Sequence, residues 1–106
     1  MINYTAAYTD QYELTMALVY YKTGRAEDRA VFDYFFRKLP FKGGYAIFAG
    51  LDNLIDILET LKFDTKDIEL LRNIGLPDDF LDYLKDFRFN GNLYSSCEGD
   101  IVFPAR

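Results

Sequence analysis

The sequence of 106 residues contains no histidine, no tryptophan, three prolines and a single cysteine. Without histidine, the chain cannot build a Ser-His-Asp triad, a Cys-His pair or a zinc site with histidine ligands, and it cannot carry a phosphohistidine. The lone Cys97 excludes a disulfide within the chain, and no histidine is present to activate it as a nucleophile. These absences leave no complete catalytic apparatus, so the sequence predicts no catalytic residue.

Positive charge is also scarce, because 12 Lys and Arg stand against 17 Asp and Glu, for a net charge of −5. This balance disfavours attraction of a phosphate backbone, so we expect no nucleic-acid partner. No apolar run approaches the ~20 residues of a membrane helix. Residues 1–8 also lack the basic, apolar and small-residue order of a signal peptide. We therefore expect no membrane partner and a cytoplasmic protein.

What the chain does contain is typical of one small globular domain, with 50% hydrophobic and 27% charged residues. Helical periodicity predicts four helices, over residues 10–23, 50–61, 64–75 and 77–84. Gly24 and Gly75 are suited to helix ends and Asp64 to an N-cap. Asp10 and Glu13 have the spacing of a capping box, although Thr9 is an equally suitable N-cap.

Segments rich in Val, Phe and Tyr predict strands at 30–37, 45–49 and 100–103. Two more strands, 87–89 and 92–95, flank an Asn90-Gly91 pair that favours a tight hairpin turn. The fold class predicted is therefore α/β of the α+β type, with helices packed on a mixed or antiparallel sheet. The leucine-rich stripe of helix 50–61 is expected to pack on that sheet.

Few polar groups form a recognisable site. Gly43-Gly44 indicates a turn between strands. A phosphate-binding loop is not indicated, because the sequence has neither a GK[ST] motif after these glycines nor the GxGxxG spacing. The carboxylates lie mostly at helix starts, so we expect neither a paired acid-base site nor a metal site. Asp33 and Arg37 fall on the same face of a predicted strand, where they either pair with each other or face a ligand.

Three strings in this sequence closely resemble the amino-terminal segments of nicotinate phosphoribosyltransferases: residues 9–17 (TDQYELTMA), 30–37 (AVFDYFFR) and 40–51 (PFKGGYAIFAGL). Residues 79–84 (DFLDYL) and 98–104 (EGDIVFP) follow in the same order and are similar too. The resemblance covers essentially the whole chain. It implies that residues 1–106 are an incomplete amino-terminal domain of a larger type II phosphoribosyltransferase, without its barrel domain.

The resemblance also implies a reaction. Enzymes of this family join nicotinate to phosphoribosyl pyrophosphate, giving nicotinate mononucleotide and pyrophosphate in NAD salvage. ATP hydrolysis is coupled to this step through a phosphorylated histidine, with ATP and Mg²⁺ as cofactors. Since this segment has no histidine, we expect it to hold no cofactor itself and to be inactive alone.

Three substrate-binding residues are implied by position in the matching strings. Tyr12 corresponds to an aromatic that stacks on the pyridine ring, and Arg37 to a basic residue near the substrate phosphates, with Lys38 a less specific neighbour. Asp10 corresponds to an acidic residue of the same pocket. Because a bare carboxylate repels nicotinate, we expect Asp10 to accept a hydrogen bond from a backbone N–H or a partner arginine.

The family architecture implies a homodimer whose active sites are shared between subunits. The isolated segment is then expected to expose a sheet edge or apolar patch and to dimerise. The alternative function is a free-standing acidic protein-interaction module of the same fold, which binds a protein partner through its aromatic sheet.

Overall fold

The computed structural model describes residues 4–105; the bounds 1–106 predicted for the domain also include residues 1–3 and 106, which lie outside this range. Its elements follow in this order: α1 (Gln11–Lys22), the short 3-10 helix η1 (Pro40–Lys42), β1 (Ala46–Ile47), α2 (Leu51–Thr60), α3 (Thr65–Asn73), α4 (Asp78–Lys85) and β2 (Ile101–Val102). β1 and β2 pair antiparallel, with Ala46 opposite Val102. The predicted combination of helices with an antiparallel sheet is confirmed at this coarse level.

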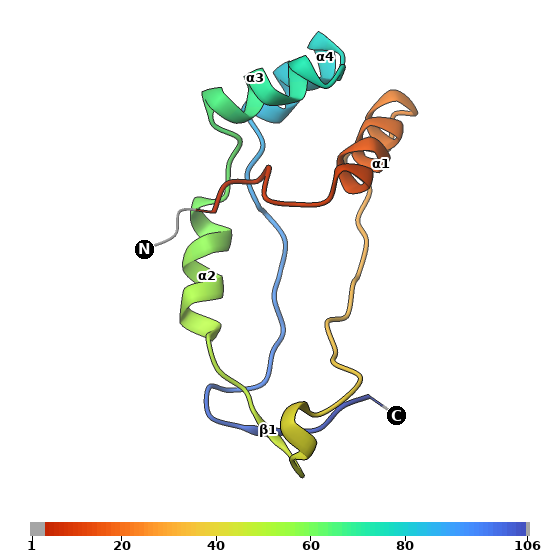
Figure 1. Cartoon of the computed structure of the whole chain (residues 1–106). Coiled ribbons are helices and arrows are strands. Elements are labelled where there is room, and N and C mark those ends of the chain that lie inside the picture. The colour runs from red at the N-terminus through yellow and green to blue at the C-terminus, as the bar shows by residue number, and fades with distance from the viewer. Residues whose placement is uncertain (1–3, 106) are drawn as a thin grey trace.

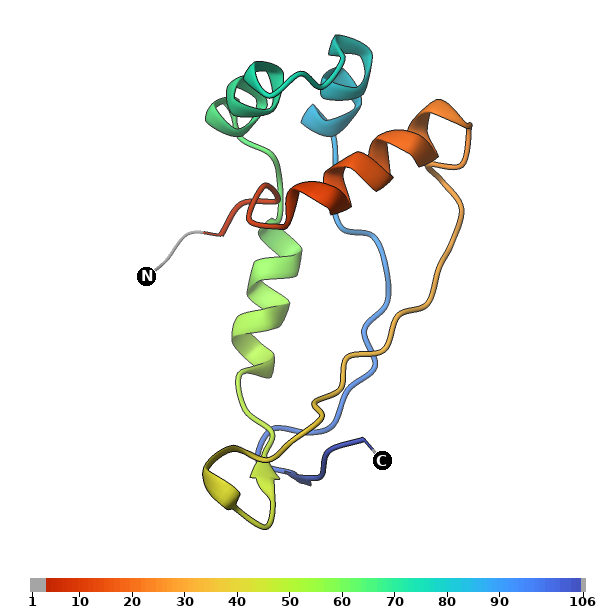
Figure 2. The ribbon, with the colours of Figure 1, turned by 45° about the vertical axis from the view of Figure 1, so that its right-hand side comes forward.

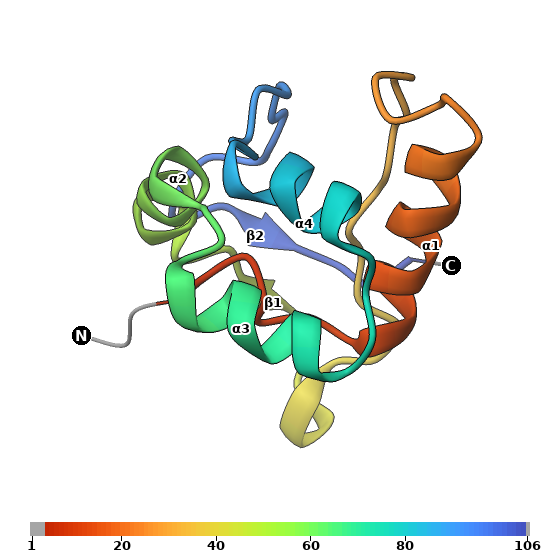
Figure 3. The ribbon, with the colours of Figure 1, turned by 90° about the horizontal axis from the view of Figure 1, so that it is seen from above.

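The hydrophobic core lies where α1, α3 and α4 meet, at one end of the molecule (Figure 1). Seen from above, α1 lies on one side of α4 and α3 on the other (Figure 3). Phe80 and Leu81 of α4 are fully buried, and Leu71 of α3 and Leu14 of α1 pack around them. The apolar residues of each helix recur every three or four positions, so each helix buries one face at this junction.

The helix ends largely follow their sequence signals. Asp64 and Asp67 form a complete capping box at the start of α3. Gly24 and Gly75 adopt left-handed φ angles of 75° and 102° just after α1 and α3. Each is followed by a residue whose N–H bonds back into the last helical turn. The predicted capping box of α1 is wrong, because the side chain of Asp10 makes no capping hydrogen bond.

The predicted strand 30–37 and the hairpin 87–95 are wrong as sheet elements. Both segments are extended, but neither belongs to a ladder, and the sheet within residues 4–105 consists of β1 and β2. One bond, from the N–H of Ala105 to the carbonyl of Phe36 at 3.0 Å, ties the first segment to the chain's end. β-Rich composition favours an extended backbone, whereas a ladder also needs a neighbouring strand with free hydrogen-bonding groups.

Helix α2 also differs from its prediction, since it packs on no sheet. None of its residues is buried, and Leu54 and Ile55 of its apolar stripe are exposed. The reason is that strands of two residues present no face broad enough to cover a helix. Among the helices of residues 4–105, none combines the length and apolar character that crossing a membrane requires.

The molecule is an open frame. Figure 2 shows α2 and two extended segments, 26–39 and 86–97, connecting the helical end to the end that carries β1 and β2. The radius of gyration is 16.8 Å, whereas a compact chain of this length has about 13 Å. The accessible surface is 9187 Å², roughly 3,000 Å² more than a compact monomer of this mass exposes. Much of the apolar surface therefore has no cover within this chain.

The position of the core gives a direct prediction. Replacing the fully buried Leu81 by alanine should lower the free energy of unfolding by about 2–5 kcal/mol, because the cavity at the helix junction cannot fill. The same change at Leu70, a largely exposed residue of α3, should cost no more than about 0.5 kcal/mol. Urea unfolding followed by circular dichroism measures both. Equal losses would place the core elsewhere.

Candidate functional site

The start of α1 brings two of the predicted site residues together on the surface. Asp10 occupies the N-cap position and Tyr12 lies in the first turn, with 61% of its side chain exposed. Tyr12 is rotated by about 200° around the helix from the buried Leu14, so it faces away from the core. Within residues 4–105, no backbone N–H donates to the carboxylate of Asp10 as an N-cap. Both side chains are thus accessible to a ligand or a second protein surface.

Tyr12 continues into an apolar stripe that the sequence analysis missed. Met16, Val19 and Tyr20 follow it at helical spacing, and all of them are about half exposed. We call Tyr12, Met16, Val19 and Tyr20 the outer stripe of α1. Because α1 is apolar on this face as well as on the core face, it has the character of a helix covered on both sides. The spacing was visible in the sequence, but the stronger inner stripe concealed it.

Arg37 lies apart from the start of α1. It belongs to the extended segment 26–39, which leads from α1 to η1 at the opposite end of the frame (Figure 2). Its side chain and that of Lys38 are exposed. Within residues 4–105, Arg37 forms no ion pair, so the predicted alternative of a pair with Asp33 is not realised. Among the described residues, the guanidinium therefore has no ionic partner.

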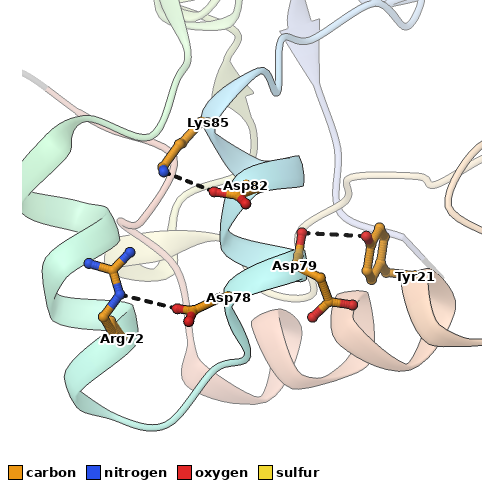
Figure 4. Close-up of polar contacts among 6 residues, drawn as sticks. All are labelled: Tyr21, Arg72, Asp78, Asp79, Asp82 and Lys85. Carbon is orange, nitrogen blue, oxygen red and sulfur yellow. Dashed lines mark hydrogen bonds and ion pairs between the residues drawn. The ribbon is translucent and has the colours of Figure 1, made fainter.

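Two shallow grooves open on the chain. One, of about 540 Å³, lies between the extended segments 26–33 and 89–94. The other, of about 450 Å³, lies beside the start of α3 and is lined by both acidic and basic side chains, among them Arg72 and Lys85. Those two are already paired with Asp78 and Asp82 (Figure 4). Neither groove includes Asp10, Tyr12 or Arg37.

Glu98 joins two distant segments of the chain at the end of the molecule that carries β1 and β2. Its carboxylate accepts hydrogen bonds from the backbone N–H groups of Gly50 and Leu51, at 2.7 and 2.9 Å, and so caps α2 from 48 residues away. These two bonds hold the pKa of Glu98 below its ordinary value. Phe48 forms two backbone hydrogen bonds with the same turn. Its N–H donates to the carbonyl of Asp100, and its carbonyl accepts from the N–H of Gly99. The sequence analysis missed this cap, because nothing local to Glu98 identifies a partner so distant in the chain.

A polar contact joins α1 to α4. The ammonium of Lys22 lies 2.6 Å from the carboxylate of Asp79, and this hydrogen bond is the main cause that lowers the pKa of Asp79. The hydroxyl of Tyr21 donates to the backbone carbonyl of Asp79 at 3.4 Å (Figure 4). Burial, together with the nearby carboxylate of Glu27, raises the pKa of Tyr83. The last turn of α1 is therefore anchored to the first turn of α4.

The described residues form a segment of α/β class with an accessible helix start and many exposed apolar side chains. Residues 8–106 match the family model described as the nicotinate phosphoribosyltransferase (NAPRTase) N-terminal domain, and the chain belongs to this family. The resemblance found in the sequence is thereby confirmed.

Curated proteins that are similar to this chain carry the name of the same family. Over 100 residues, the chain is 42% identical to nicotinate phosphoribosyltransferase pncB2 of Mycobacterium tuberculosis, covering 93% of this chain and 21% of that protein. It is 45% identical over 97 residues to nicotinate phosphoribosyltransferase of Bacillus subtilis, covering 91% and 20%. For the protein of that name from Caenorhabditis elegans, the identity is 41% over 103 residues, covering 91% and 18%. The chain thus spans about a fifth of the length of these transferases.

The Glu98 cap predicts a specific pH dependence. Its folded-state pKa lies below the unfolded value, so the charged carboxylate stabilises the fold at neutral pH. This contribution is lost as the pH falls through the lowered pKa. Glu98→Gln should therefore lower the Tm at pH 7, and the gap to the unchanged chain should narrow once the pH drops below about 4, where glutamate ordinarily titrates.

Thermal unfolding between pH 7 and pH 3 measures this effect. Glu69→Gln is the matched control, since Glu69 is an exposed residue of α3 and should give no such gap. A gap for Glu98→Gln that stays constant across the whole pH range would contradict the cap.

Proposed function

We propose that this chain is the amino-terminal part of a nicotinate phosphoribosyltransferase. The whole enzyme would join nicotinate to phosphoribosyl pyrophosphate and release nicotinate mononucleotide and pyrophosphate, as an ATP-coupled, ligase-type step of NAD salvage in the cytoplasm. Family membership over residues 8–106 supports this proposal, as do relatives that carry this name at about 40% identity.

The open surface is the structural observation that carries the proposal. Val31, Phe32 and Tyr34 are each more than nine-tenths exposed, in an extended segment without a ladder partner. Such apolar surface is costly in water and is ordinarily buried in an interface. We infer that the remaining part of a type II phosphoribosyltransferase, with its barrel domain, covers this exposed segment. We also infer that a second subunit completes a homodimer with shared active sites.

Within that enzyme, Tyr12, Asp10 and Arg37 would contribute to the substrate pocket. The exposed ring of Tyr12 is held on a helix anchored to the core, which suits stacking on a flat pyridine ring. Asp10 would accept a hydrogen bond from an arginine or backbone N–H of the neighbouring subunit. The guanidinium of Arg37 forms no ion pair within residues 4–105 and is suited to a substrate phosphate, which it can bind through two N–H groups.

Within residues 4–105, no three side chains of the metal-ligating types converge. We propose that ATP and Mg²⁺ bind to residues outside this segment. The chain has no histidine to accept a phosphoryl group, and we expect it to be inactive by itself.

The role of Tyr12 can be tested in the full-length enzyme. Tyr12→Ala should raise the KM for nicotinate about three- to tenfold, since the stacking contribution is lost, while kcat stays within twofold or so. Steady-state kinetics with saturating phosphoribosyl pyrophosphate measures this. Tyr20→Ala, on the same outer stripe two turns along, is the matched control and should leave the KM unchanged.

An unchanged KM for Tyr12→Ala would contradict the substrate-binding role. If both alanine variants instead weakened subunit association to the same extent, the outer stripe of α1 would be only a protein interface. That outcome would favour the alternative of an interaction module.

A further inference from the structure

The last turn of α1 and the first turn of α4 are joined by three kinds of contact. One is the Lys22–Asp79 ion pair, and another is the hydrogen bond from Tyr21 to Asp79 (Figure 4). In addition, the ring of Tyr21 packs on Phe80 and Tyr83. The ring centroids are 5.5 and 5.1 Å apart, respectively. Since Phe80 is fully buried, this contact connects the end of α1 directly to the centre of the core.

The charges of this contact match the orientation of the two helices. Lys22 lies in the last turn of α1, where the helix dipole favours a cation, and Asp79 lies in the first turn of α4, where it favours an anion. The pair therefore stabilises one relative orientation of the helices. An exposed pair of this kind adds little to overall stability, and it favours this orientation of the helices by the same small free energy.

Because α1 is long, a small change in its angle at the α4 contact would shift the other end of the helix by a larger distance. Its 12 residues span about 18 Å, so a tilt of about 10° around the α4 contact alone would move the first turn by about 3 Å. Leu14, in that first turn, is packed in the core and opposes such a tilt. Because a misplacement of about 1 Å is enough to affect binding and turnover, the place of Tyr12 depends on the contact at the end of α1 as well as on Leu14.

We propose that Lys22 and Asp79 are positioning residues for the substrate pocket: they fix the angle of α1 against α4 and thereby the place of Tyr12. This inference rests on the proposed function, in which Tyr12 contacts nicotinate. Neither Lys22 nor Asp79 touches the substrate in this account. Their role would be to keep the first turn of α1 in register with the pocket that the neighbouring subunit completes.

The test uses the full-length enzyme and a matched pair of lysine variants. Lys22→Met should raise the KM for nicotinate about two- to fivefold with kcat unchanged, which corresponds to the loss of one exposed ion pair. Lys85→Met is the control: Lys85 is equally half exposed and pairs with Asp82 at 2.9 Å, but this pair lies within α4 and does not touch α1. It should leave the KM unchanged.

A double variant separates positioning from general damage. Lys22→Met combined with Asp79→Asn should raise the KM no further than either single change, because all of them remove the same contact. Loss of stability alone would lower the amount of active enzyme, and hence kcat, without moving the KM.

Equal KM values for Lys22→Met and Lys85→Met, or additive effects in the double variant, would overturn the positioning role. If Tyr12→Ala raises the KM and Lys22→Met does not, only this inference fails. If Tyr12→Ala also leaves the KM unchanged, the proposed substrate-binding role of Tyr12 fails, and this inference fails with it.

Discussion

The side chains of Phe80 and Leu81 are fully buried at the junction where α1, α3 and α4 meet, and they form the centre of the hydrophobic core within residues 4–105. From it, α2 and two extended segments lead to a second, smaller anchor, where Glu98 caps α2 beside the β1–β2 pair. Between these two anchors, most side chains of segments 26–39 and 86–97 and of α2 are exposed. The segment therefore has packed residues at both ends and an exposed middle with many apolar side chains.

Helix α1 shows how this arrangement could serve function. Its inner face contributes Leu14 to the core, and its last turn is anchored to α4. Its outer stripe, with Tyr12 at one end, is left uncovered. A helix fixed on one side and apolar on the other is suited to presenting a side chain at an interface. In the proposed enzyme, one helix would thus belong to the domain core and to the shared pocket at the same time.

The helices could be predicted from the sequence because each carries its own signals, such as the box at Asp64 or the glycine after α3. Two of the predicted strands, 45–49 and 100–103, are confirmed, because β1 and β2 lie within them. The strand at 30–37 was wrong, because composition around Phe32 favours extension without naming a partner, and none is present within residues 4–105. The residues alone indicated only an ordinary helix start at Tyr12; its assignment as a site came from the family resemblance. The distant partners of Glu98 left no trace in the local sequence.

The central claim is that this segment works as part of a longer transferase. The most direct test is the intact mass of the natural protein in cell extract, detected with an antibody against this segment. The account predicts a species several times heavier than the 12.4 kDa of this chain, in keeping with relatives of which it spans about a fifth. A natural species of 12.4 kDa would contradict it and would direct attention to a separate binding partner.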